Sequence, residues 1–169
     1  MAVVFDFSAK TFRDEIYTEY KSHRPPMPEE LVPQFPLTRD ATRAYSIPSI
    51  ELEGWEADDI IATYARQARQ AGADVLIVSA DKDLMQLVGP GVSMYDPASG
   101  QAGVAGSREE RRFGVEEVVK YFEGVGPDKV IDVQALAGDS TDNIPGAPGI
   151  GVKTAAQLIL EYGDLETLL

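Results

Sequence analysis

The sequence of 169 residues contains no cysteine, so disulfide bonds and thiolate metal sites are excluded. Its longest apolar runs are about six residues, whereas a membrane-spanning helix needs about 20. An acid also interrupts the N-terminal segment MAVVFDF too early for a signal peptide. These absences predict a cytoplasmic protein with no membrane partner.

Basic side chains are also few. Fifteen lysines and arginines face 28 acids, which gives a formal net charge of −13. This balance argues against a protein that holds nucleic acid on a broad basic surface. Hydrophobic residues make up 44% of the chain, enough for the core of a folded domain.

Two short apolar segments, residues 2–6 and 74–81, are rich in β-branched residues, and each ends in an aspartate. Such segments are typical of strands buried in a parallel sheet that helices cover. Apolar periodicity predicts helices at 10–24, 58–71, 114–122, 128–138 and after the glycines near 150, and a strand at 49–53. We therefore expect an α/β fold, with a polar loop from about 98 to 112 and a domain boundary near Pro127.

Three acids, Glu56, Asp58 and Asp59, crowd the start of the predicted helix 58–71. Helix capping and the helix dipole account for one or two of them, but less well for three. Further acids follow the predicted strands or lie in the turn-rich segment GDSTDN, where a capping or Asx-turn role stays an alternative. The candidate metal ligands are Asp6, Glu56, Asp58, Asp59, Asp81, Asp83, Asp139 and Asp142.

Oxygen donors of this kind favour Mg²⁺ or Mn²⁺ over Zn²⁺, and the chain has only one histidine. Two such ions suit phosphodiester hydrolysis, in which one activates water and the other stabilises the leaving oxygen. Bound metal ions would also offset much of the negative charge, so that a polyanionic substrate could approach. We further expect Asp59→Asn to leave the stability of the metal-free protein unchanged or to raise it.

The glycine-rich stretch PGAPGIGVKTA at 145–155 fails the P-loop pattern, because Val152 separates Gly151 from Lys153. It instead predicts a tight turn between two helices, whose backbone amides and following helix N-terminus hold a DNA phosphate. A plain corner between helices, with Lys153 as a solvated charge, stays open. For Lys21 and Arg24, too, an alternative to a functional role stays open: both are solvated charges on a surface helix.

Four segments occur in an order that resembles the 5′ nuclease domain found at the N-terminus of bacterial DNA polymerase I, within the flap endonuclease family. They are FDFSAKTFRDEIYTEYKSHRPPMP, GWEADDIIATYA, VSADKDLMQLV and GDSTDNIPGAPGIGVKTAAQLI. The resemblance covers nearly the whole chain and is highly specific. It implies a PIN-like core at 1–127, with a parallel sheet flanked by helices, and a helix-three-turn-helix (helix-hairpin-helix) DNA-binding region at 128–169.

The resemblance also implies an activity: structure-specific 5′-3′ exonuclease and flap endonuclease cleavage in DNA replication and repair, including removal of RNA primers. The partners would be 5′ flaps, nicked or gapped duplexes and RNA-primed ends, bound by a monomer that is part of DNA polymerase I and acts at the bacterial nucleoid. Two Mg²⁺ or Mn²⁺ ions would bind the eight acids, and a K⁺ ion would assist the glycine hairpin. Lys21 and Arg24 would be catalytic contacts to the scissile phosphate, and the DNA-binding set would be Tyr20, Lys21, Arg24, Gly149, Gly151, Lys153 and Thr154.

One departure from the family pattern concerns the start of the chain. The family has an earlier strand that carries another metal-site aspartate, and this sequence starts after it and stops soon after the hairpin's second helix. We therefore hypothesise a truncated form whose nuclease activity is weakened or absent. The alternatives are a DNA-structure-binding module without chemistry and, in a third class, a Toprim-like or phosphatase-like phosphoryl-transfer domain.

Overall fold

The chain forms two compact units in the computed structural model, which describes residues 1–100 and 107–169. Unit 1 consists of residues 1–61 and 141–143, and unit 2 consists of residues 62–140 and 144–169. Each unit contains its own pair of parallel strands, so the α/β class expected from the sequence is confirmed. The domain boundary near Pro127 stays a prediction.

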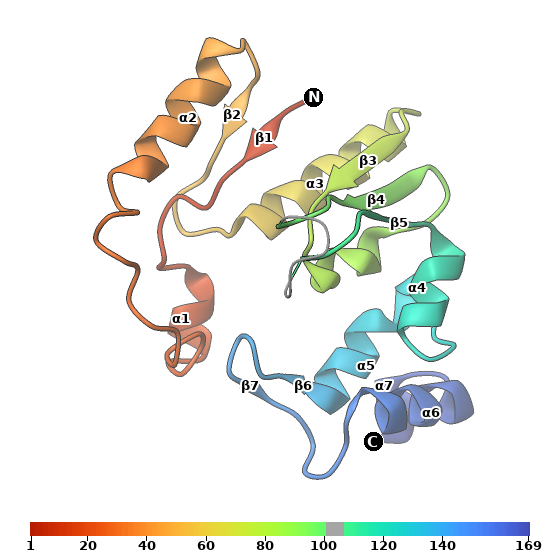
Figure 1. Cartoon of the computed structure of the whole chain (residues 1–169). Coiled ribbons are helices and arrows are strands. Elements are labelled where there is room, and N and C mark those ends of the chain that lie inside the picture. Colours follow the sequence, from red (N-terminus) through yellow and green to blue (C-terminus); the bar gives the residue numbers. More distant parts are fainter. Residues whose placement is uncertain (101–106) are drawn as a thin grey trace. The chain divides into compact units, whose positions relative to one another are not determined.

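Unit 1 is built on a parallel pair of very short strands, β1 (Val3–Val4) and β2 (Ser49–Ile50), with α2 (Gln34–Ala44) beside β2 (Figure 1). Arg39 of α2 ties the two strand ends together. Its guanidinium lies 2.6 Å from Glu51 after β2 and donates to the backbone carbonyl of Asp6 after β1, at 2.7 Å. Arg39 therefore fixes the backbone position of Asp6, the acid that follows β1.

The predicted helix at 10–24 is wrong over most of its length. The helix α1 covers only Phe12–Ile16, starts at a capping box formed by Thr11 and Asp14, and ends where Tyr17 adopts an extended conformation. The chain then turns, and Lys21 has a positive φ of 53°. Tertiary contacts explain the difference, because the turn buries Tyr20 to 8% exposure and directs its hydroxyl to two acids.

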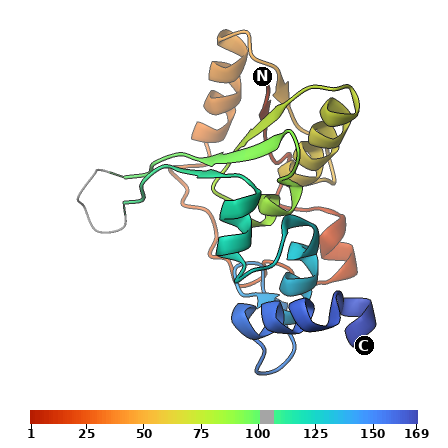
Figure 2. The same ribbon diagram turned by 90° about the vertical axis from the view of Figure 1, so that its right-hand side faces the viewer.

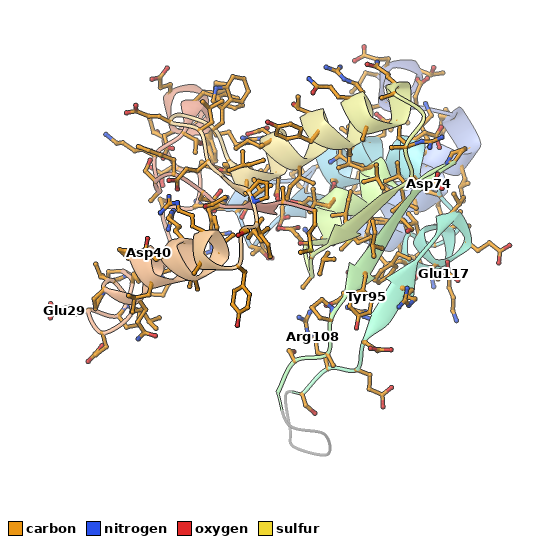
Figure 3. All side chains as sticks on the ribbon, turned by 90° about the horizontal axis from the view of Figure 1, so that it is seen from above. Glu29, Asp40, Asp74, Tyr95, Arg108 and Glu117 are labelled. Atoms are coloured by element: carbon orange, nitrogen blue, oxygen red, sulfur yellow. The ribbon has the colours of Figure 1, made fainter. Side chains whose placement is uncertain are left out.

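Unit 2 contains a three-stranded sheet of β3 (Val75–Val78), β4 (Val92–Asp96) and β5 (Arg111–Phe113). Strand β4 pairs with β3 in parallel and with β5 in antiparallel orientation, so the sheet is mixed. The sequence did not predict β4 and β5, and the loop predicted at 98–112 is wrong at its end, because Arg111 and Arg112 belong to β5. Figure 3 labels Tyr95 and Arg108 on the two arms of this hairpin, and residues 101–106 of the predicted loop lie outside the described residues.

Helices complete both units. The long helix α3 covers Ala57–Gln70 and the 3₁₀-helix η1 covers Lys82–Leu87, close to the helices predicted at 58–71 and after Asp81. Farther along the chain lie α4 (Val115–Tyr121), η2 (Pro127–Lys129), α5 (Val130–Ala137), α6 (Val152–Tyr162) and α7 (Leu165–Leu168). In the described part of the chain, no helix is long and apolar enough to cross a membrane.

The core of unit 2 contains the helices α5 and α6, which pack against each other (Figure 2). Ala155 and Ala156 of α6 have no exposed surface, and Val130 and Val133 of α5 are equally buried. Small side chains on α6 let the two helix backbones approach closely, which excludes water from the contact. This contact holds the segment between the two helices, which carries the predicted hairpin.

A second close approach joins β6 (Gly138–Asp139) to β7 (Ile144–Pro145) in antiparallel pairing. Gly138 has a φ of +73°, and a Cβ atom there would lie 2.2 Å from the backbone nitrogen of Gly146. Only glycine tolerates both the left-handed backbone and this contact. The pairing places Asp139 at a defined point directly after α5.

Candidate active site

The first acid, Asp6, follows β1 and caps the helix α3. Its Oδ1 accepts a hydrogen bond from the backbone N–H of Ala57, the first residue of α3, at 2.7 Å. The start of a helix has unpaired N–H groups and a positive dipole end, so a carboxylate is favourable there. The sequence placed Asp6 at a strand end, and the structure adds that it is bound to the start of a helix.

Asp59 has a structural set of contacts within the first turn of α3. It accepts the backbone N–H of Glu56 at 3.0 Å and binds both terminal nitrogens of Arg13, at 2.7 and 2.8 Å. The hydrogen bond from Arg13 is the main reason that the pKa of Asp59 lies below its usual value. The same contact raises the pKa of Arg13. Asp58 is half-buried in the same turn.

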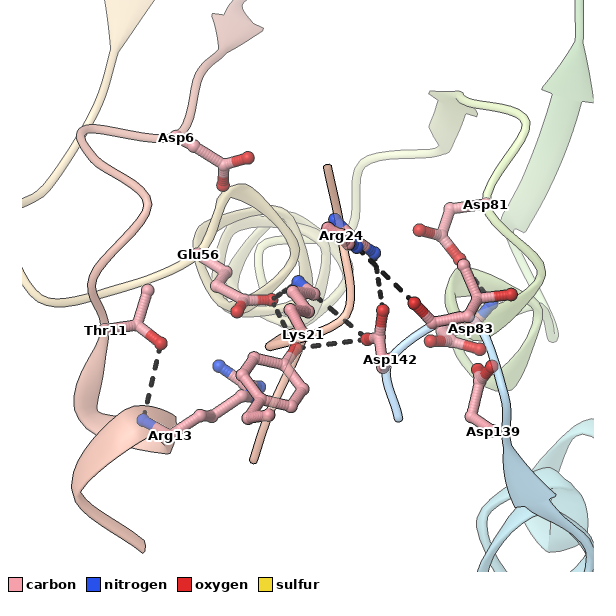
Figure 4. A network of polar contacts seen from close by, with 12 residues as sticks. Asp6, Thr11, Arg13, Lys21, Arg24, Glu56, Asp81, Asp83, Asp139 and Asp142 are labelled. Atoms are coloured by element: carbon pink, nitrogen blue, oxygen red, sulfur yellow. Dashed lines mark hydrogen bonds and ion pairs between the residues drawn. The ribbon is translucent and has the colours of Figure 1, made fainter. Parts of the chain in front are cut away.

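The structure brings Glu56 and Asp142 together around one lysine (Figure 4). Lys21 Nζ lies 3.0 Å from Glu56 Oε2 and 3.8 Å from Asp142 Oδ2. Arg24 adds a second cation to Asp142, at 2.5 Å from its Oδ1. The ammonium of Lys21 therefore bridges two carboxylates that lie 86 positions apart in the sequence and were both predicted as metal ligands.

Tyr20 completes this cluster in unit 1. Its hydroxyl lies 3.1 Å from Glu56 Oε2 and 3.1 Å from Asp142 Oδ2, and it donates its proton to one of them at a time. Burial, followed by the charge of Glu56, raises the pKa of Tyr20 above its usual value, so it stays a donor. The predicted DNA contacts Tyr20, Lys21 and Arg24 thus all bind acids in this structure.

The acids of unit 2 repeat the arrangement with a different lysine. Asp81 is the N-cap of η1 and accepts the backbone N–H of Asp83 at 2.9 Å. Lys82 Nζ binds Asp83 Oδ1 at 3.0 Å and also donates to Asp139 Oδ2. Burial lowers the pKa of Lys82, but the hydrogen bonds to Asp139 and Asp83 outweigh it and raise the pKa above its usual value.

Two residues of these networks had no role in the sequence-based prediction. Arg13 binds Asp59 across 46 positions, and Gln134 of α5 donates to Asp83 across 51 positions. The sequence around Arg13 and Gln134 does not point to these contacts. Both residues lie in predicted helices, where a polar side chain on the exposed face is expected in any case. Only the tertiary structure identifies them.

Metal binding can be assessed from the donors around each bridging lysine. Among the residues that the structure describes, no three His, Cys, Asp or Glu side chains lie together so as to hold one ion. In each unit, however, a lysine ammonium lies between two carboxylates. The donors are all oxygen, which fits Mg²⁺ or Mn²⁺ chemistry.

The predicted glycine hairpin precedes α6. Gly149 has a φ of +79°, and Gly151 is the N-cap of α6, without a side chain to satisfy the first amides. Lys153 and Thr154 are exposed in the first turn of the helix. An exposed helix N-terminus with adjacent lysine is suited to a phosphate group.

Family models cover both regions of the chain. Residues 1–123 match the family described as 5′-3′ exonuclease, N-terminal resolvase-like domain, and residues 125–169 match 5′-3′ exonuclease, C-terminal SAM fold. This chain belongs to the 5′-3′ exonuclease family. The recognition made from the sequence motifs is therefore confirmed, as is a resolvase-like α/β region followed by a helical one.

The relatives of this 5′-3′ exonuclease family member include much longer proteins. The chain is 60% identical, over all of its 169 residues, to DNA polymerase I of Rhizobium leguminosarum, and it spans 16% of that protein. It is 42% identical to a 5′-3′ exonuclease of Aquifex aeolicus, of which it spans 55%.

A solved structure shares the fold of the family member. The T5 D15 protein, co-crystallised with metal ions, matches with a TM-score of 0.80 and 26% identity, over 99% of this chain and 63% of that one. The likeness extends over nearly every described element. The metal ions are those of the T5 protein, and for the present chain they support a proposal.

Proposed function

We propose that the chain is a divalent-metal-dependent 5′ nuclease that hydrolyses phosphodiesters at 5′ flaps and 5′ ends of DNA. The observation that carries this proposal is the pairing of predicted metal ligands around a single lysine in each unit, in a chain of the 5′-3′ exonuclease family. Carboxylates held as close pairs need a cation, and divalent ions take the same oxygen donors.

The eight predicted acids would hold two Mg²⁺ or Mn²⁺ ions, namely Asp6, Glu56, Asp58, Asp59, Asp81, Asp83, Asp139 and Asp142. Bound ions of this kind supply an activated water and neutralise developing negative charge. Lys21 and Arg24 would contact the scissile phosphate, because both carry positive charge beside the acids and Arg24 is half-exposed. Tyr20 would orient the segment that carries Lys21 and Arg24, through its hydrogen bonds to Glu56 and Asp142.

The DNA duplex would be bound by the region 128–169, which also supplies Asp139 and Asp142, and the other six metal ligands belong to the region 1–127. Gly149, Gly151, Lys153 and Thr154 would contact phosphates through backbone amides and the lysine charge, and a K⁺ ion would assist there. The biological substrates would be flaps and RNA-primed ends in replication and repair, processed at the nucleoid in the bacterial cytoplasm. We propose that the chain acts as a monomer and as part of a DNA polymerase I.

Cleavage of a 5′-labelled flap duplex tests the proposal. We expect cutting near the flap junction in Mg²⁺, none in EDTA, and a loss of at least about 100-fold in Glu56→Gln, which removes one charged ligand. Glu53→Gln is the matched control, since it removes an exposed carboxylate three positions earlier. Equal activity of Glu56→Gln and the wild type would contradict the proposal.

A second function, DNA binding without cleavage, is favoured by one observation. Within the described ranges 1–100 and 107–169, no three potential ligands are grouped for one metal ion. A gel-shift assay on the same flap duplex distinguishes the two functions. Binding without metal-dependent cutting would support the binding module, and cutting would exclude it.

A further inference from the structure

Lys82 connects two carboxylates of unit 2 that the proposed function assigns to metal. Its Nζ lies 3.0 Å from Asp83 Oδ1 and donates to Asp139 Oδ2. Asp83 is a neighbour in the sequence, whereas Asp139 lies 57 positions farther along. The ammonium therefore links two segments of unit 2.

The position of Lys82 is set by its local structure. It is the first residue of η1, and the N-cap Asp81 accepts the backbone N–H of Asp83 at 2.9 Å. The side chain of Lys82 is 36% exposed, whereas that of Asp139 is 10% exposed. The lysine thus has a path to solvent, while one of its partners is largely enclosed.

Lys82 and a metal ion would compete for the same carboxylate oxygens. Mg²⁺ binds carboxylate oxygens at about 2.0–2.1 Å, and an ammonium hydrogen-bonded to those oxygens would meet a doubly charged cation at close range. Lysine side chains carry a positive charge at neutral pH, and the ammonium of Lys82 contacts both carboxylates. Repulsion between the two cations therefore disfavours the binding of both to these carboxylates at once.

We propose that Lys82 is a built-in competitor of the divalent ion: its single positive charge partly offsets the charges of Asp83 and Asp139 in the metal-free protein, and it must leave them when metal binds. The inference rests on the proposed function, which assigns both carboxylates to metal. It adds that Lys82 sets the metal affinity of this part of the chain. Gln134, which donates to Asp83 and is neutral, can stay in place in both states.

The carboxylates of unit 1 differ from those of unit 2 in the contacts that remain when one lysine is removed. Asp142 is bound by Arg24 at 2.5 Å as well as by Lys21, so removal of Lys21 leaves a cation on that carboxylate. At Asp83, the second contact is the neutral amide of Gln134. The effect of removing one lysine charge on metal affinity should therefore be clearer for Lys82.

Substitution of Lys82 by methionine tests the competition, because methionine keeps an unbranched chain and removes the charge. We expect Lys82→Met to bind Mn²⁺ about threefold to tenfold more tightly, measured as free Mn²⁺ by electron paramagnetic resonance. Lys82→Arg, which keeps the charge, should bind like the wild type. Lys120→Met, which removes an exposed charge from α4, is the matched control and should also leave the affinity unchanged.

The outcomes separate this inference from the proposed function. Equal or weaker Mn²⁺ binding by Lys82→Met, with binding lost in Asp83→Asn, would overturn the competition and leave the metal assignment intact. Absence of Mn²⁺ binding by the wild type, or full binding by Asp83→Asn, would overturn both.

A measurement on the wild-type chain avoids any effect of substitution on folding. Acetylation of lysine amines, followed by mass spectrometry, reports how accessible each ammonium is. We expect Mg²⁺ to increase the modification rate of Lys82 severalfold and to leave Lys120 unchanged. An unchanged or reduced rate at Lys82 in the presence of Mg²⁺ would contradict displacement.

Discussion

At the scale of the residue, the acids of this chain are held by the chain's own cations. Arg13 binds Asp59, Lys21 bridges Glu56 and Asp142, and Lys82 bridges Asp83 and Asp139. Each partner lies far from its acid in the sequence or belongs to another element. Clustered carboxylates therefore do not destabilise the metal-free chain as much as their number implies.

These contacts change the effect on stability that we expect of Asp59→Asn. An amide cannot form the paired charged hydrogen bonds to Arg13, and it weakens the contact with the backbone N–H of Glu56. We expect the metal-free protein to lose about 1–2 kcal/mol of unfolding free energy, measured by urea denaturation. The sequence alone had predicted no loss. Glu53→Gln serves as the control, and an unchanged midpoint in Asp59→Asn would restore the earlier expectation.

The pH dependence of stability should reflect the same ion pair. The pKa of Asp59 is lowered in the folded chain, so the unfolded chain binds the proton more readily near pH 4. The stabilisation is complete above the ordinary pKa of about 4 and is lost as the pH falls through the lower folded value. Arg13→Met should therefore flatten the loss of stability between about pH 5 and pH 2, as measured by urea denaturation at each pH. An identical pH profile in both proteins would contradict the assignment.

At the scale of the element, the observed helices match the sequence-based prediction where local contacts define them. They differ from the prediction where contacts with distant segments decide the conformation. The helix predicted at 58–71 is observed at Ala57–Gln70, since its apolar face and first-turn acids are local signals. The helix predicted at 10–24 ends at Ile16, because Tyr20 is drawn into contacts with Glu56 and Asp142. Strands β4 and β5 stabilise each other by pairing, which periodicity does not reveal.

The close approach of β6 to β7 predicts a large difference between two glycines with similar backbones. Gly138→Ala would place a Cβ atom 2.2 Å from the nitrogen of Gly146, whereas nothing lies within 4 Å of a Cβ atom at Gly72, whose φ is +81°. We expect Gly72→Ala to cost about 1 kcal/mol, and Gly138→Ala to cost more than about 3 kcal/mol or to prevent folding. Thermal unfolding followed by circular dichroism measures both. Equal costs would show that the strand pairing relaxes.

At the scale of the whole molecule, the net charge of −13 limits the electrostatic attraction between the chain and DNA. The chain has 15 basic residues, and several of them bind acids of the chain itself, including Lys21, Arg24 and Lys82. Apart from the proposed contacts of Lys21 and Arg24 with the scissile phosphate, few positive charges therefore remain to release counterions from DNA. Exposed Lys153, at the start of α6, is a candidate for such a contact.

The salt dependence of DNA binding should accordingly be shallow. We expect the logarithm of the binding constant for a flap duplex to fall with log salt at a slope of about −2 to −4, and Lys153→Met to reduce its magnitude by about 1. Lys120→Met should leave the slope unchanged. Fluorescence anisotropy in Ca²⁺ from 50 to 300 mM salt measures the slopes. A steep slope that is insensitive to Lys153 would contradict the predicted hairpin contact.

The sequence by itself determined the family, the α/β class and the identity of the candidate acids, because motifs and strand-end aspartates are local patterns of residue type. The tertiary structure alone decided which acids share a cation, where the segment after α1 turns, and that Arg13 and Gln134 belong to the networks. The physical reason is that hydrogen bonds and ion pairs between distant segments depend on the path of the backbone. A local pattern carries no information about such contacts.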